Sequence, residues 1–110
     1  MDDFVSRILN HAKKIKARYE ELSELISAPE IIADNKLFRR LAAEHASIEE
    51  TAEAYDVLKK LISDLEKSRA EILSAAQTEL RSVYEADIAE LESDIELTAD
   101  RLKALLLPAY

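Results

Sequence analysis

Apolar residues recur every three or four positions along almost the whole chain, which is the spacing of one face of an α-helix. The first such stripe predicts an amphipathic helix over about residues 3–27, and its apolar positions are Phe4, Ile8, Ala12, Ile15, Tyr19, Leu22 and Ile26. Asp2 or Asp3 is expected to cap the first turn. Pro29 is expected to end the helix, because the residue before a proline is pushed out of the helical region.

A break in the pattern follows at the sequence SAPEIIADNK. Ser27 and Glu30 stand at the spacing of a capping box, so a short helical turn is expected over residues 29–33. Asp34 is then expected to cap a second long helix that starts near Asn35.

Two further stretches keep the helical spacing. The second helix is expected over about residues 36–75, with its apolar face on Phe38, Leu41, His45, Ile48, Ala52, Tyr55, Leu58, Ile62, Leu65 and Ile72. The third is expected over about residues 79–106, with its apolar face on Leu80, Tyr84, Ile88, Leu91, Ile95, Thr98, Leu102 and Leu105. Three apolar stripes can close one shared core, so the pattern predicts an all-α fold: an antiparallel three-helix bundle with a long helical hairpin.

The position of the hairpin turn is not marked by the usual residues, because the chain has no glycine and no proline lies between Asn35 and Leu107. One unbroken helix over that range would be about 110 Å long. Such a rod would have to be an oligomeric coiled coil, as in a self-associating scaffold or adaptor, and this alternative stays open. A turn within residues 74–78 is preferred, because Ser74 and Gln77 have capping-box spacing and Thr78 can cap the next helix.

Composition narrows the function. The 110 residues fit one domain, residues 1–110. Without glycine or cysteine there is no glycine-rich phosphate loop, no thiolate metal site and no cysteine nucleophile. No apolar run approaches the length of a membrane span, so a cytoplasmic protein with no membrane partner is expected.

Candidate chemistry is sparse. His45 and Glu49 stand one helical turn apart, but neither histidine completes the Glu-x-x-His pattern of metal-binding bundles. His45 is therefore expected at the edge of the core. We expect no enzyme activity, no metal, no cofactor and no small-molecule substrate, although a metal-binding bundle enzyme stays open as a further alternative.

Charge is unevenly distributed along the chain, whose net charge is −8. Residues 1–27 hold five basic and five acidic side chains, whereas residues 79–101 hold two basic and eight acidic ones. A polyanionic partner should therefore meet the first segment, and the last helix should face solvent or a basic surface. The candidate partner contacts are the cations Lys13, Lys14, Lys16, Arg18, Arg39 and Arg40.

From Tyr19 to Pro108 the sequence resembles the N-terminal domain of bacterial class I peptide chain release factors, in the branch that reads UAA and UAG codons. Two motifs carry the resemblance: YEELSELISAPEIIADNKLFRRLAAEHASIEETAEAY, and the LLLP that closes this domain in the family. Two departures stand out. The Asp-Pro-Glu common at the family's hairpin turn is replaced by AQTEL, and the sequence stops at Tyr110 where the family continues into further domains.

The resemblance implies a part in translation termination. In the family, later domains supply a codon-reading tripeptide and a Gly-Gly-Gln loop that admits water to the peptidyl-tRNA ester, and this glycine-free chain cannot contain that loop. It further implies docking near the stalk base of the large ribosomal subunit and contact with the class II release-factor GTPase.

We therefore expect a docking arm that forms one part of a longer factor. Its hairpin turn should be the distal reach point. The opposite end should gather Pro29, Asn35, Phe38 and Leu107, beside the remaining domains of the factor.

Overall fold

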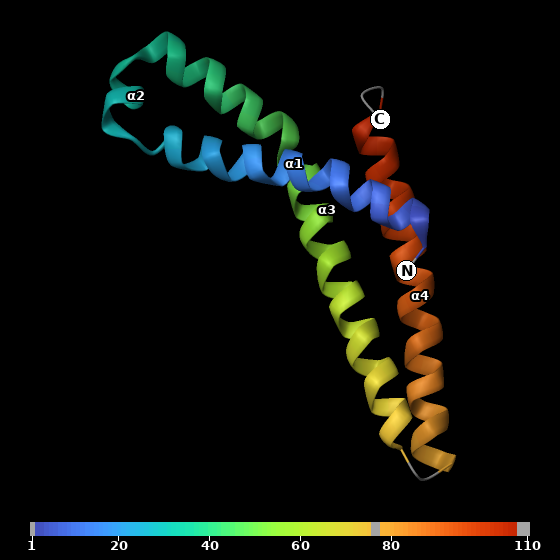
Figure 1. The fold of residues 1–110 in the computed structure, drawn as a ribbon. Coiled ribbons are helices and arrows are strands. Elements are labelled where there is room, and N and C mark those ends of the chain that lie inside the picture. The colour runs from blue at the N-terminus through green and yellow to red at the C-terminus, as the bar shows by residue number, and fades with distance from the viewer. Residues whose placement is uncertain (1, 76–77, 108–110) are drawn as a thin grey trace.

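The computed structural model describes residues 2–75 and 78–107, and the elements within those ranges are all helices. They are α1 (Asp3–Leu25), α2 (Pro29–Ala33), α3 (Asn35–Ser74) and α4 (Thr78–Leu106). The predicted all-α fold is confirmed, and α3 and α4 form the long hairpin (Figure 1). Ala75 has an extended backbone after α3. The single helix over residues 35–107 that a coiled-coil rod requires is therefore not observed.

The two long helices of the N-terminal half begin at aspartate caps, as predicted. The Asp2 carboxylate accepts a hydrogen bond from the Phe4 backbone N–H at 3.1 Å. The Asp34 carboxylate accepts one from the Leu37 N–H at 3.2 Å. Each bond satisfies a backbone donor that has no partner within the first turn of its helix.

The capping box expected at Ser27 is wrong. Ala28 is the N-cap of α2 and makes no side-chain hydrogen bond, while the Ser27 hydroxyl donates to the Ser23 carbonyl at 2.9 Å. Pro29 explains the difference, because it brings a helical φ angle to the first position and has no N–H to satisfy. The second expected capping box includes Gln77, which lies outside the described residues.

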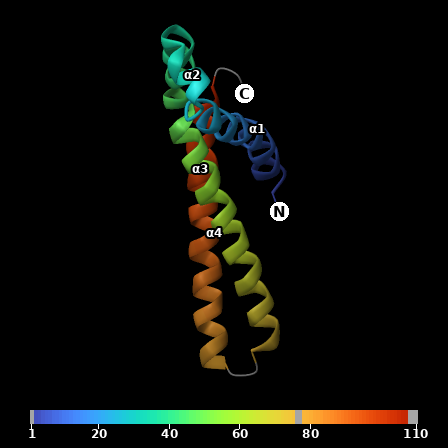
Figure 2. The same ribbon diagram turned by 90° about the vertical axis from the view of Figure 1, so that its left-hand side faces the viewer.

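Three helices meet in one region, where α1 crosses the hairpin (Figures 1 and 2). The core there comprises Val5, Ile8, Ala12, Ala54, Leu58, Ile62, Leu65, Ile95, Ala99, Leu102 and Leu106. The alanines contributed by the three helices, Ala12, Ala54 and Ala99, are fully buried. A methyl side chain lets neighbouring backbones approach closely, so these alanines set how tightly the helices cross.

Beyond the crossing the helices pair two by two. The "α1–α3 arm" consists of the C-terminal half of α1, α2 and the N-terminal half of α3. The "α3–α4 arm" consists of the rest of α3 and most of α4 (Figure 1). The radius of gyration is 18.7 Å, compared with about 13 Å for a compact domain of 100 residues. The molecule is therefore elongated, and its longest extent of 63 Å matches the length of one 40-residue helix, α3.

The expectation that Pro29, Asn35, Phe38 and Leu107 gather at one end is wrong. α2 and the start of α3 form the far end of the α1–α3 arm, whereas the last turn of α4 lies by the start of α1 (Figure 1). Lys103 Nζ lies 5.8 Å from the centre of the Phe4 ring. The reason is that α1 crosses the hairpin near its own N-terminus, so its C-terminal half points away from α4. Pro108, at which the resemblance to the family ends, lies outside the described residues.

Candidate docking surfaces

Two of the six predicted contact cations link α1 to α3. Arg18 Nε and Nη2 lie 2.6 and 2.8 Å from the carboxylate oxygens of Glu44, and Arg18 also pairs with Glu21. Lys16 Nζ lies 2.8 Å from Asp56 Oδ2. The predicted role of Lys16 and Arg18 in binding a partner stays a prediction, but a partner would have to compete with these intramolecular carboxylates.

The Arg18–Glu44 pair makes the stability of the α1–α3 arm depend on pH. Hydrogen bonding by Arg18, more than its charge, holds the pKa of Glu44 below its ordinary range against an opposing effect of burial. A carboxyl whose pKa is lower in the folded state stabilises the fold above its unfolded pKa of about 4.3. That stabilisation is lost as the pH falls through the lower folded pKa.

Glu44→Gln is therefore expected to lower the urea midpoint of unfolding at pH 7 by a small amount, since the pair is half-exposed. The difference in urea midpoint between Glu44→Gln and the unsubstituted chain should become smaller as the pH falls below about 4, because Glu44 is then protonated. Glu53→Gln, at an exposed position of the same helix, should leave the midpoint unchanged at pH 7. If Glu44→Gln lowered the urea midpoint by the same amount at every pH, the ion pair with Arg18 would not be the cause of the loss.

His45 lies at the edge of the core, as predicted. It is half-buried, and its ring stacks on Tyr19 with the ring centroids 4.2 Å apart. Its Nε2 lies 2.8 Å from the Ser23 hydroxyl of α1. Within residues 2–75 and 78–107, no three potential ligand side chains gather where they could hold a metal ion. The imidazole thus joins α1 to α3.

The other four predicted cations are exposed. Lys13 and Lys14 lie in the middle of α1, and Arg39 and Arg40 lie near the start of α3. In the part of the chain that the structure describes, none of the close ion pairs involves them, although the charge of Arg40 also contributes to lowering the pKa of Glu44. A partner could therefore bind these four cations without breaking any of the described ion pairs within the chain. Their role stays a prediction.

The tip of the α3–α4 arm presents apolar side chains to solvent. Leu73 is 88% exposed, Val83 55% and Leu80 45%. Leu80 belongs to the predicted apolar face of the third helix and was expected to be buried, whereas Leu73 and Val83 belong to no predicted apolar face. Leu73 and Val83 are large apolar residues outside the predicted apolar faces, one on each side of the predicted turn. That position was the only indication in the sequence that they would be exposed. An apolar tip on an extended arm is a candidate contact surface.

Polar contacts join α3 and α4 between the core and the tip. Arg69 Nη2 lies 3.1 Å from Glu92 Oε2 and joins α3 to α4. The charge of the Glu71 carboxylate, followed by burial and a hydrogen bond to the same group, raises the pKa of the Tyr84 phenol. The two helices therefore stay paired close to the turn. No helix in the described ranges is both long and apolar enough to cross a membrane.

Comparison with known proteins identifies relatives of the chain. The family model of the PCRF domain matches residues 15–110. Peptide chain release factor 1 from Bacillus licheniformis and the protein of the same name from Bacillus subtilis are each 34% identical over 101 residues. That match covers 92% of this chain and 28% of each relative.

The protein of that name from Brevibacillus brevis is 34% identical over 94 residues, which cover 86% of this chain and 26% of the relative. The chain thus spans little more than a quarter of the length of these curated relatives. No solved structure gives a significant match.

Proposed function

The chain belongs to the PCRF domain family, and from that membership we propose that it is the N-terminal docking domain of a bacterial peptide chain release factor. The observation that carries the proposal is the match over residues 15–110, together with the 34% identity to peptide chain release factor 1. The factor would act in translation termination at UAA and UAG codons in the cytoplasm. Codon recognition and hydrolysis would belong to other parts of such a factor.

The proposed role is mechanical and not catalytic. Two helical arms diverge from one core, and a packed helix pair resists bending far better than a loop of the same length. The described side chains link the helices by ion pairs and by the contact of Ser23 with His45. The Ser23 hydroxyl donates its proton to the Tyr19 carbonyl and not to the imidazole, so this contact is not that of an activated nucleophile. Such a body is suited to holding the rest of a factor at a defined distance from a binding partner.

The proposed partners are the ribosome, at the stalk base of its large subunit, and the class II release-factor GTPase. The hairpin tip with Leu73, Leu80 and Val83 would provide the distal contact. The exposed cations Lys13, Lys14, Arg39 and Arg40 would meet ribosomal RNA phosphates. The remaining domains of the factor would attach at the core end of the molecule, where α4 ends.

Co-sedimentation with bacterial ribosomes tests this proposal. The chain is expected to pellet with ribosomes at low salt and to be displaced by excess full-length peptide chain release factor 1 from Bacillus subtilis, the relative named above. Binding should weaken steeply with salt, because phosphate contacts release counterions. The same mixture programmed with a stop codon should release no peptide above background, since the chain has no glycine to form a Gly-Gly-Gln loop.

Serum albumin at the same concentration is a control for non-specific pelleting. Failure to bind ribosomes at any salt concentration would contradict the docking role. Peptide release above background would contradict the absence of catalysis. Sedimentation velocity of the chain alone is expected to give a monomer, whereas an obligate dimer would favour the scaffold alternative.

A further inference from the structure

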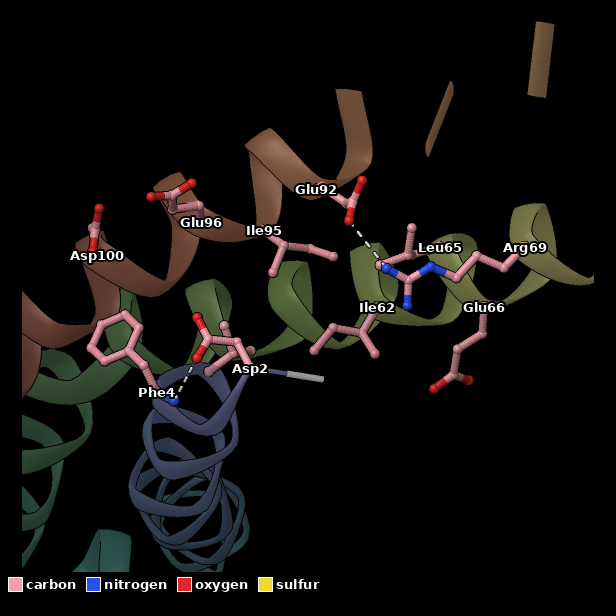
Figure 3. Close-up of a pocket in the computed structure, with 11 residues that line it drawn as sticks. Asp2, Phe4, Ile62, Leu65, Glu66, Arg69, Glu92, Ile95, Glu96 and Asp100 are labelled. Carbon is pink, nitrogen blue, oxygen red and sulfur yellow. Dashed lines mark hydrogen bonds and ion pairs between the residues drawn. The ribbon is translucent and has the colours of Figure 1, made fainter. Parts of the chain in front are cut away.

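A groove of about 390 Å³ lies where the start of α1 meets the α3–α4 arm (Figure 3). Its apolar lining comes from all three long helices: Phe4, Val5, Ile62, Leu65 and Ile95. Most of this lining already belongs to the core, and Ile62, Leu65 and Ile95 are 7–8% exposed. The groove is therefore a shallow continuation of the surface on which α1 itself is seated.

The rim of the groove is strongly acidic. It carries one arginine among five carboxylates: Asp2, Glu66, Arg69, Glu92, Glu96 and Asp100. Two of the carboxylates are engaged, because Glu92 pairs with Arg69 at 3.1 Å and Asp2 caps α1. The remaining three are exposed and form no ion pair within the described part of the chain.

We propose that this groove docks a helical segment of a partner protein whose apolar face is flanked by lysine or arginine side chains. The apolar floor would receive one or two large apolar side chains. The three exposed carboxylates, on Glu66, Glu96 and Asp100, would receive the cations.

The occupant follows from shape and charge together. On α3 the lining runs from Ile62 to Arg69, and on α4 from Glu92 to Asp100. Each stretch is about 10–12 Å long, or two helical turns. The same face already accepts a helix, because Val5 and Ile8 of α1 pack against the hairpin beside it. A partner helix would lie on the hairpin next to α1 and extend the three-helix packing.

The acidic character extends beyond the groove. Residues 79–101, which supply its α4 side, hold eight acidic and two basic side chains. A negative potential of this kind attracts a cationic segment and repels nucleic acid. The groove is thus a protein-binding surface, separate from the apolar tip and the exposed cations, and the inference does not rest on the proposed function.

Fluorescence anisotropy with a designed peptide tests the inference. The probe is a labelled helical peptide of about 14 residues with leucine on one face and lysine elsewhere. It should bind, and the affinity should fall as salt rises from about 0.1 M to about 1 M, since the Debye length shrinks from about 10 Å to about 3 Å. A peptide with glutamate in place of lysine should not bind, and a scrambled leucine–lysine peptide should bind at least about tenfold more weakly.

Paired charge reversals locate the binding. Glu66→Lys combined with Glu96→Lys should weaken binding of the probe about tenfold. Glu30→Lys combined with Glu53→Lys makes the same change in net charge at exposed positions away from the groove and should leave the affinity nearly unchanged. Circular dichroism confirms that both variants are folded.

Equal weakening by the two double variants would overturn the inference, because the overall charge and not the groove would then attract the peptide. Absence of binding, or equal binding of the glutamate or scrambled peptide, would overturn it as well. Association of two copies of the chain that the probe disrupts would indicate that a second copy occupies the groove and would also count against the inference. None of these outcomes bears on ribosome binding, which is measured separately.

Discussion

Leu102→Ala is expected to lower the free energy of unfolding by about 2–5 kcal/mol. Leu102 is fully buried in the region where α1, α3 and α4 meet, so its truncation removes apolar contacts and leaves a cavity lined by all three helices. The surrounding helices can relax only partly, because the small alanines already hold them close together. Urea unfolding followed by circular dichroism measures the change.

Leu97→Ala is the matched control, since it makes the same chemical change in the same helix at a side chain that is 65% exposed. Leu97→Ala should change the free energy of unfolding by no more than about 0.5 kcal/mol. If Leu102→Ala were no more destabilising than Leu97→Ala, the three-helix crossing would not be the stabilising core of the molecule.

Val57→Pro is expected to lower the free energy of unfolding by about 3 kcal/mol or more. Val57 lies in α3 between the core residues Ala54 and Leu58, at the point where α3 passes from one arm into the other. A proline there removes a backbone N–H donor, and its ring clashes with the preceding turn. Because α3 belongs to both arms, the kink should disturb the packing of α1 and of α4 together.

Val57→Ala separates the backbone effect from the loss of the side chain. Val57 is 48% exposed, so its truncation should change stability by about 1 kcal/mol or less, partly offset by the better helix propensity of alanine. Thermal unfolding of the two variants gives the comparison. Equal stability of Val57→Pro and Val57→Ala would mean that α3 is not one continuous helix through the crossing.

The helices could be predicted from the sequence because each has an apolar stripe with a period close to 3.6 residues and a local signal at its start. The caps at Asp2 and Asp34 are such signals, and both were found in the structure. The capping box at Ser27 failed because spacing alone does not show that Pro29 removes the need for a cap.

Tertiary features were harder to predict. A single stripe assumes one partner face, yet α3 packs against both α1 and α4, and α4 packs against both α1 and α3. The buried Ala54 of α3 and Ala99 of α4 therefore lay outside the predicted stripes. The divergence of the two arms depends on where α1 crosses the hairpin, which no local pattern encodes.

The candidate site shows the same limit. Six cations could be named from the sequence, but only the fold reveals that Lys16 and Arg18 face carboxylates of α3 while Lys13 and Arg39 face solvent. Which helix faces which, and at what register, decides whether a charge stabilises the fold or stays available to a partner. For the acidic groove, the only indication in the sequence was the excess of carboxylates in residues 79–101.

Site-specific crosslinking to the ribosome tests most directly whether the chain is a docking arm. The chain has no cysteine, so Leu73→Cys introduces a single thiol, and a photoreactive group can be attached there. Leu73 is the most exposed of the large apolar side chains described at the hairpin tip. Leu97→Cys, on α4 far from the tip and on a different helix from the exposed cations, is the matched control at 65% exposure. We predict that Leu73→Cys crosslinks to the large ribosomal subunit and that Leu97→Cys does not. Products with the small subunit alone, or none from Leu73→Cys, would contradict the proposal that this arm docks on the large subunit.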